Sequence, residues 1–152
     1  MHEALMGLGA ISQAEVQGNA SWDLLLRQLA KNGRALRLAD EKLWLARERL
    51  GLLQSVYPDA VLEPALQMLP GFDQAPEPDL ALTELLRARL SGHGPSTAPQ
   101  IAAPLGKPLP AVEQALARLE AEGYVLRGHF SLVQPTCSGA NAICWRAFIA
   151  TP

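Results

Sequence analysis

The amino-acid sequence predicts a mainly α-helical protein with small β elements, that is, an α+β fold. Its residues are 49% hydrophobic but only 5% aromatic, so leucine and alanine must build most of the core, and both favour helices. One run places leucines three and four residues apart, on a single side of a helix, at Leu82, Leu85, Leu86 and Leu90. Between Arg34 and Leu38 the spacing changes to an alternation of every second residue, which indicates a β-strand.

Residues 1–68 are expected to form a helical region that contains one β-hairpin. The hairpin joins the alternating segment at 34–38 to a second apolar segment at 43–45. A helix from about residue 47 to residue 56 should follow it, because Tyr57-Pro58 disfavours further helix. Five prolines then lie between Pro58 and Pro78. Since such a segment cannot hold a long helix, we predict a proline-rich linker at 69–78.

Two helix starts carry the signature of a capping box. Ser12 stands three residues before Glu15, and Thr97 stands three residues before Gln100. In this arrangement the hydroxyl accepts from a free backbone N–H at the start of the helix, while the longer side chain reaches back to the cap residue. A helix is therefore predicted to begin at each position.

Residues 79–131 are expected to form three short helices and a strand. The leucine-rich helix comes first, a helix from Thr97 to Leu105 comes second, and Pro110 suits the first turn of the third. The third helix has one apolar face, which is made by Val112, Ala115, Leu116 and Leu119. Tyr124 to Leu126 then favour a strand that leads into a turn at Arg127-Gly128. This is the order of a winged helix-turn-helix domain.

Five segments of the chain resemble the large helicase-related (Lhr) family of ATP-dependent DNA helicases. They are residues 43–50 (LWLARERL), 57–60 (YPDA), 85–90 (LLRARL), 94–97 (GPST) and 119–130 (LEAEGYVLRGHF). Their order along the chain is that of the family. The resemblance implies a fragment that covers the end of the helicase-associated (DEAD/H-associated) domain and the winged helix that follows it.

The resemblance also implies a function. The intact relative would use ATP and Mg²⁺ to track along single-stranded DNA and unwind duplexes in DNA repair, so the expected partners are DNA, as a single strand or a duplex junction, and the remaining domains of the helicase. No phosphate-binding loop of the Gly-x-x-x-x-Gly-Lys type and no Asp-Glu-x-His box occurs in this chain. We therefore expect no catalytic residue and no cofactor in the chain itself.

The resemblance stops after Phe130, and residues 132–152 are expected to form an irregular tail. We hypothesise that this tail is read out of frame. A set of GC-rich codons chosen for Ser138 to Thr151, read one base earlier, would encode a segment similar to the family's continuation.

Composition excludes several classes of protein. A net charge of −2 and a pI near 5.9 argue against a general electrostatic attraction to nucleic acid. Cys137 and Cys144 have no histidine pair near them, so neither a disulfide framework nor a metal site is indicated. The chain lacks a signal-peptide pattern and a segment of membrane-spanning length, so we expect a soluble, cytoplasmic protein without a membrane partner.

Seven of the thirteen basic residues lie between positions 27 and 49, which makes this stretch the stronger candidate for contact with nucleic acid. Within it we select Arg34, Arg37 and Arg47 as cations for phosphates, and Trp44 as a platform for a base. In the alternative interpretation, Trp44 belongs to the core and the arginines are solvated.

Arg127 and His129, at the wing turn, are the second candidate for DNA contact. The alternative is a tight turn with a solvated arginine, and the family more often has arginine where this chain has His129. The third helix reads the major groove in transcription factors. Here it carries three acidic residues (Glu113, Glu120 and Glu122) against Arg118, so we expect it to serve packing.

Two other classes of protein stay open. A stand-alone winged-helix transcriptional regulator would need a third helix that binds duplex DNA. A DNA glycosylase related to tandem winged-helix proteins would need a catalytic carboxylate in a pocket, and the sequence offers no residue for that role.

Overall fold

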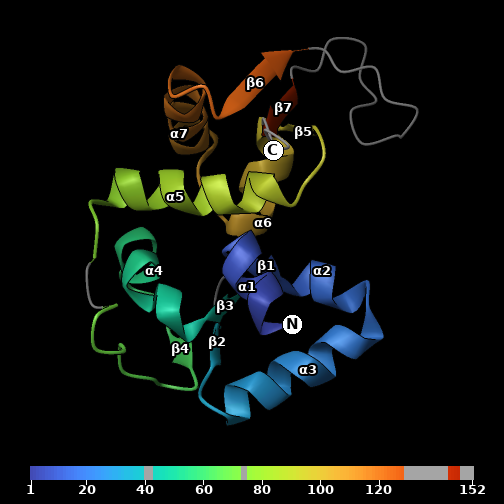
Figure 1. Cartoon of the computed structure of the whole chain (residues 1–152), viewed down its shortest axis with the longest axis vertical. Coiled ribbons are helices and arrows are strands. Elements are labelled where there is room, and N and C mark those ends of the chain that lie inside the picture. The colour runs from blue at the N-terminus through green and yellow to red at the C-terminus, as the bar shows by residue number, and fades with distance from the viewer. Residues whose placement is uncertain (40–42, 73–74, 129–143, 148–152) are drawn as a thin grey trace.

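The computed structural model describes residues 1–39, 43–72 and 75–128, and the backbone of 144–147. These residues form a mixed α and β structure with two small antiparallel sheets (Figure 1). The prediction of an α+β fold is therefore confirmed. No helix among the described residues has the length and apolar character that crossing a membrane requires.

The N-terminal half surrounds a four-stranded sheet of order β1-β3-β2-β4. Its elements are α1 (His2–Leu8), β1 (Ile11–Ser12), α2 (Gln13–Gln17), α3 (Ala20–Lys31), β2 (Ala35–Leu38), β3 (Leu43–Ala46), the 3-10 helix η1 (Arg47–Arg49), α4 (Leu50–Val56) and β4 (Leu62–Glu63). The predicted hairpin is β2 with β3, in which Ala35 pairs with Ala46 and Leu38 with Leu43. The predicted helix after it is also confirmed, with η1 as its first turn.

Both faces of this hairpin are covered by helices. Leu36 and Leu45 face a core shared with α4 and α5, whereas Trp44 lies on the other face with Leu26 of α3 and Leu5 of α1. Figure 1 shows the sheet between α4 on one side and α1 and α3 on the other. A strand buried on both faces lacks a polar side, which explains why all four residues of β3 are buried.

The C-terminal half contains α5 (Pro78–Ser91), β5 (Ser96–Thr97), α6 (Ala98–Leu105), α7 (Leu109–Ala121), β6 (Val125–Gly128) and β7 (Cys144–Ala147). The second sheet has the order β5-β7-β6. The three predicted helices and the strand after them are confirmed. Thr97 and Gln100 form the predicted capping box, and Gly106 ends α6 in the left-handed conformation, with φ of 60°.

Strand β7 differs from the irregular tail that we expect from residue 132 onward. Cys144–Ala147 pairs antiparallel with both β5 and β6, and Trp145 lies opposite Arg127. Cysteine and tryptophan suit a strand, and β7 fills the space between two short strands that would otherwise have open edges. The remainder of the predicted tail, including the proposed shift of frame, lies outside the described residues.

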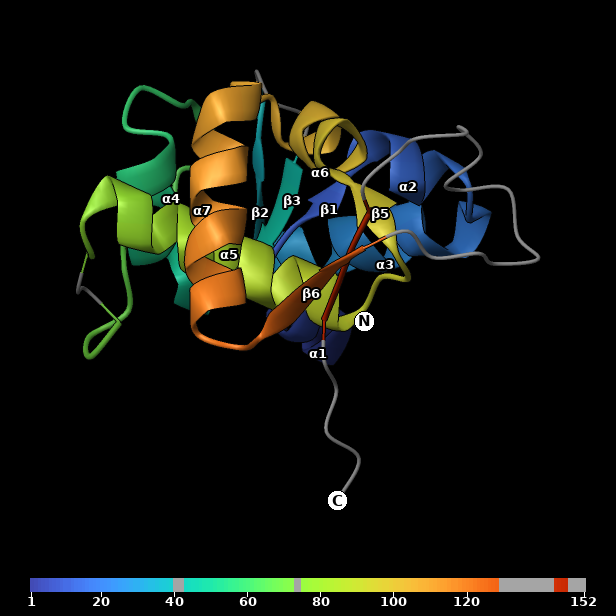
Figure 2. The ribbon, with the colours of Figure 1, turned by 90° about the horizontal axis from the view of Figure 1, so that it is seen from above.

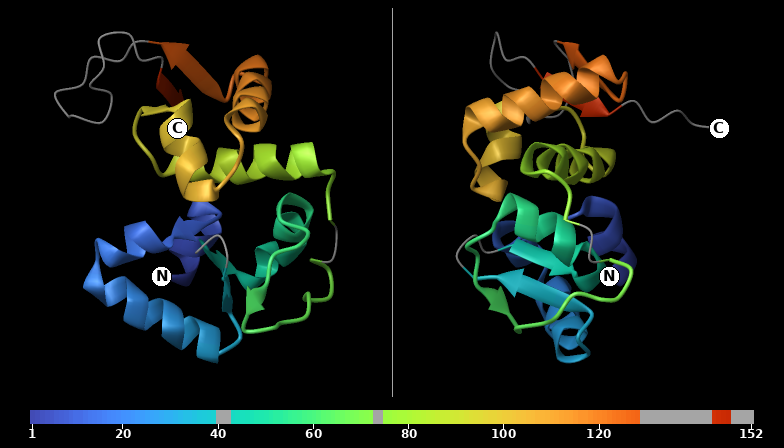
Figure 3. Two further views of the ribbon diagram at one scale, coloured as in Figure 1. Left: turned by 180° about the vertical axis from the view of Figure 1, so that it is seen from behind. Right: turned by 90° about the vertical axis from the view of Figure 1, so that its left-hand side faces the viewer.

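Helix α5 is the element that joins the two halves. Figure 3 shows it between the N-terminal sheet and α7, and Figure 2 shows α7 crossing it. One hydrophobic core runs through both halves, from Leu36 and Leu53 through Leu85 to Leu116 and Val125. Because this core is shared, the halves should unfold together.

Candidate functional site

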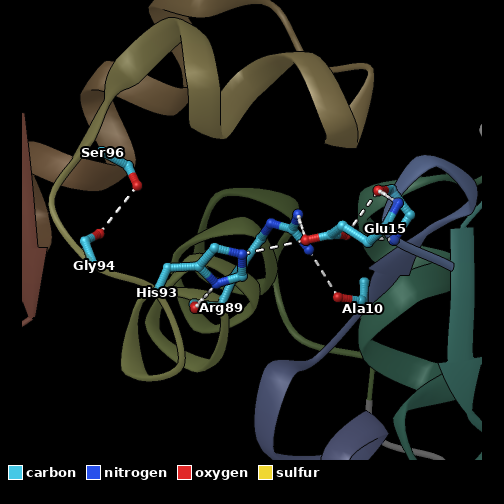
Figure 4. Close-up of polar contacts among 7 residues, drawn as sticks. Ala10, Glu15, Arg89, His93, Gly94 and Ser96 are labelled. Carbon is cyan, nitrogen blue, oxygen red and sulfur yellow. Dashed lines mark hydrogen bonds and ion pairs between the residues drawn. The ribbon is translucent and has the colours of Figure 1, made fainter. Parts of the chain in front are cut away.

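A buried polar cluster connects α5 to the N-terminal half (Figure 4). Arg89 of α5 is only 5% exposed. Its Nη1 donates to the backbone oxygen of Ala10 at 2.8 Å, and its Nη2 donates to Oε1 of Glu15 at 2.8 Å. A buried guanidinium needs such partners, because an unpaired charge away from water is strongly unfavourable.

Ser12 and His93 complete the environment of the Glu15 carboxylate. The backbone N–H of Ser12 donates to Oε2 at 2.7 Å and the backbone N–H of Glu15 donates to the Ser12 hydroxyl at 3.3 Å, which together form the predicted capping box. The Ser12 hydroxyl also donates to Oε2 at 2.7 Å. His93 Nε2 lies 3.2 Å from Oε1, and its Nδ1 lies 2.8 Å from the backbone oxygen of Arg89. Burial acts to raise the pKa of Glu15, but hydrogen bonds from His93 and Ser12 and the charge of Arg89 outweigh it and lower the pKa well below its usual range.

A cavity of about 450 Å³ adjoins this cluster, and its polar lining comes from Ser12, Glu15, Arg89, His93, Ser96 and Gln100. The Ser96 hydroxyl donates to the backbone oxygen of Gly94 at 3.0 Å, so it is directed to its own loop (Figure 4). The Glu15 carboxylate is fully engaged as an acceptor, and a satisfied carboxylate beside a buried arginine is a poor general base. We interpret the cluster as a structural link. Within the described residues, no three histidine, cysteine or carboxylate side chains gather to hold a metal ion.

The residues predicted from the basic stretch are distributed among separate contacts. Exposed Arg34 places Nη2 3.3 Å from Nδ1 of His2. Arg37 pairs with Glu63 at 2.7 Å, and Arg47 donates twice to the backbone oxygen of Gln67, at 3.0 and 2.9 Å. Arg34 and Arg47 are neighbours across the hairpin, because the backbone N–H of Arg47 donates to the backbone oxygen of Arg34 at 3.1 Å. Their side chains nevertheless engage different partners, and Arg37 and Arg47 already have acceptors.

Trp44 occupies the position that the alternative interpretation describes. Its side chain is 6% exposed and packs in the core between the sheet and α3. The indole Nε1–H donates to Oε1 of Gln13 at 3.0 Å, and the Arg37 guanidinium lies 6.0 Å from the ring centroid. Little of the ring is accessible for stacking on a base.

The predicted wing residue Arg127 is 54% exposed in its side chain and lies 3.5 Å from Oε1 of Glu120. His129 lies outside the described residues. Two further arginines of this half also pair with carboxylates: Arg118 is 3.3 Å from Asp79, and Arg87 pairs with both Glu84 and Glu122. The outer surface of α7 thus presents carboxylates together with cations that they partly neutralise.

Sequence reasoning missed a groove beside α3. It has a volume of about 800 Å³ and is lined by Leu24, Arg27, Gln28, Ala30, Lys31, Trp44 and Pro64. Four of these lining residues, Leu24, Arg27, Gln28 and Lys31, are exposed, and their spacing of three and four positions places them on one stripe of α3. That spacing is visible in the sequence. Pro64, which directly follows β4, also lines the groove, and no sequence pattern predicts that it lies beside α3.

Searches of known protein-family models and of curated proteins find no match for this chain.

Proposed function

We propose that this chain is an auxiliary, non-catalytic segment of an Lhr-type ATP-dependent DNA helicase. The segment would comprise the end of the helicase-associated domain and the winged helix after it. The observation that carries the proposal is the arrangement of residues 78–147, in which the element order is α5-β5-α6-α7-β6-β7 and the sheet order is β5-β7-β6. A winged helix-turn-helix has this element order, with a helix pair followed by a β-ribbon.

The segments that resemble the family also have structural roles in this arrangement. Residues 85–90 supply the buried core positions Leu85, Leu86 and Leu90 of α5, and Arg89 within them reaches across to Glu15. Residues 119–128 cover the end of α7, the turn at Gly123 with φ of 73°, and β6. The similarity therefore coincides with packing and turn positions, which supports a shared fold.

The proposal does not include recognition of duplex DNA by α7, the helix that binds the major groove in winged-helix transcription factors. Its acidic residues would meet the negatively charged phosphates of DNA, and Glu120 and Glu122 already pair with Arg127 and Arg87. The opposite side of α7 is buried against α5, through Val112, Leu116 and Leu119. We therefore assign the winged helix a scaffold role, in which it packs against the end of the helicase-associated domain and stabilises it.

In this proposal the energy-converting step belongs to the motor domains of the intact helicase, which would bind ATP and Mg²⁺. This chain would stabilise the part of the helicase that supports the motor domains and would provide part of the surface that contacts DNA.

The DNA that flanks the coding region gives the direct test. We expect an upstream reading frame that encodes ATPase motor motifs and joins the present sequence in register. A complete, isolated gene with no motor sequence beside it would contradict the proposal. So would ATP hydrolysis by the purified chain in preparations free of contaminating helicase.

A free-standing transcriptional regulator predicts a different result. Such a protein should bind a specific duplex as a dimer, through a third helix that can approach phosphates. In a gel-shift assay at low salt we expect no sequence-specific binding of duplex DNA, because the carboxylates of α7 oppose it. Sequence-specific dimeric binding would favour the regulator instead.

A further inference from the structure

The groove beside α3 combines a charged wall with an apolar floor. Arg27, Gln28 and Lys31 stand on the wall, and Leu24, Trp44 and Pro64 contribute apolar surface. Leu24 is 71% exposed, the highest value among the large apolar side chains that the structure describes. Figure 1 shows α3 on the outer side of the sheet, away from α5 and the C-terminal half. The groove is therefore separate from the Glu15–Arg89 cluster.

The cations of this wall are accessible to an anion. The Arg27 side chain is 65% exposed, and its ion pair with Asp23 at 2.7 Å lies on the surface of the same helix. An exposed pair of this kind contributes little to stability, so a phosphate can replace the carboxylate. Lys31 is exposed one turn further on and makes no ion pair within the described part of the chain. The carboxylate of Glu63, which precedes the lining residue Pro64, is paired with Arg37.

We propose that this groove binds a single strand of nucleic acid, with phosphates on Arg27 and Lys31 and base faces on Leu24 and Pro64. The inference rests on the proposed function and specifies where that segment would contact the strand. Sites for single strands combine cations that follow the backbone with side chains, mostly aromatic, on which the bases stack. In this groove Leu24 and Pro64 would supply that surface, as apolar contact rather than aromatic stacking. Gln28 lies between the two cations, and its amide can both donate to and accept from a base edge.

The test uses a fluorescein-labelled thymidine oligonucleotide of about 12 nucleotides, a length within the range of known single-strand sites. Fluorescence anisotropy at low salt should show binding by the full chain. We expect Arg27→Gln and Lys31→Gln each to weaken it about three- to tenfold and to reduce the slope of log affinity against log salt by about 0.7, the value for one lost phosphate contact on a single strand.

Two further variants separate phosphate contact from base contact and from general charge. Leu24→Ser should weaken binding without changing the salt slope, because it removes apolar surface only. Arg118→Gln is the matched control, since Arg118 is also a helical arginine in a surface ion pair, but lies on α7. It should leave the affinity unchanged within about twofold. Circular dichroism should show the same fold for all four variants, because the substituted side chains lie at the surface.

Three results would overturn the inference: no binding by the unaltered chain, equal losses in Arg118→Gln and Arg27→Gln, or full displacement of the oligonucleotide by polyglutamate of equal charge. The last result would identify the groove as a surface for acidic peptides. None of them depends on the flanking gene, so failure here and failure of the proposed function are distinguishable.

Discussion

Arg89 and Glu15 form an ion pair across the junction of the two halves, with Nη2 2.8 Å from Oε1 and the arginine side chain 5% exposed. One partner lies on the helix that begins the C-terminal half, and the other lies in the first turn of α2. The hydrogen bond from Arg89 to the backbone of Ala10 adds a second connection at the same place. The junction is therefore held by directional bonds as well as by the shared apolar core.

Replacing Glu15 with alanine should destabilise the whole chain. The substitution leaves the buried Arg89 guanidinium without its charged partner and removes half of the capping box of α2. Removal of one partner from a buried pair costs about 3–5 kcal/mol, and the 31% exposure of the Glu15 side chain places the expected loss near 3 kcal/mol. Urea unfolding measures it. Glu3→Ala, at an exposed position in the first turn of α1, is the control and should change stability by less than about 0.5 kcal/mol.

The lowered pKa of Glu15 makes stability depend on acid pH. In the folded chain the carboxyl holds its proton more weakly than in the unfolded chain, where its pKa is near 4.5. Its contribution is thus fully present well above pH 4.5 and is lost as the pH falls below that value. Unfolding midpoints measured from pH 6 to pH 3 should fall more steeply for the unaltered chain than for Glu15→Gln. Parallel curves would show that Glu15 is not the group responsible.

A second link between the halves lies at the end of α4. The Tyr57 hydroxyl donates to the backbone oxygen of Leu105 at 2.6 Å, and Lys107 Nζ donates to that of Val56 at 2.6 Å while lying 3.8 Å from the centroid of the Tyr57 ring. Tyr57→Phe removes one hydrogen bond and leaves the Leu105 carbonyl without that donor. We expect a loss of about 1–2 kcal/mol in urea unfolding. A loss below about 0.3 kcal/mol would show that water replaces the hydroxyl.

Substitutions of Trp44 distinguish a role in the hydrophobic core from a role in stacking on a nucleic-acid base. Because the indole is almost entirely buried, Trp44→Ala should cost about 3–5 kcal/mol of stability, as large-to-small changes in a core do. Trp44→Phe retains most of the packing but loses the hydrogen bond to Gln13, so a smaller loss of about 1–2 kcal/mol is expected. Because Trp44 borders the groove with only 6% of its surface exposed, any loss of affinity for the thymidine oligonucleotide in Trp44→Phe should be small and should accompany the loss of stability. A large loss of affinity with little loss of stability would instead support stacking.

The sequence predicted those contacts of the fold in which the two interacting residues lie close together along the chain. Both capping boxes were predictable because their two side chains lie within one helical turn. The Arg89 partner of Glu15 is 74 residues away, so no local pattern contains it. Strands β1, β4 and β5 have two residues each, too few to show an alternation.

The candidate sites were less predictable for a related reason. Charge density along the chain indicated the basic stretch, but it could not show that Arg37 and Arg47 bind Glu63 and the backbone of Gln67. Nor could the alternation at β2 and β3 show that both faces of the hairpin are covered, which is what buries Trp44. These contacts depend on which helix covers which face, and that is decided by the tertiary packing.

Gly9 allows the contact between α1 and α5 to be tested with a matched control. It ends α1 with φ of 74°, and a Cβ added there would lie 3.1 Å from Cβ of Ala88 and 3.1 Å from Cδ1 of Leu85. Gly71 has φ of 87°, but a Cβ there would have no atom within 4 Å. In both positions alanine must adopt a positive φ, which costs about 1–3 kcal/mol. Only at position 9 must side chains of α5 also give way, which adds about 1–3 kcal/mol.

Gly9→Ala should therefore lower the free energy of unfolding by clearly more than Gly71→Ala does. The difference between the two variants reports chiefly how tightly α1 is packed against α5, because both variants place alanine at a positive φ. Since α5 carries Arg89, a shift of this helix should also lengthen the bond to Glu15. The acid sensitivity of Gly9→Ala should then be weaker than that of Gly71→Ala. If the two variants are equally stable, α1 and α5 have room for the added methyl group, and their packing at Gly9 is looser than the 3.1 Å distances indicate.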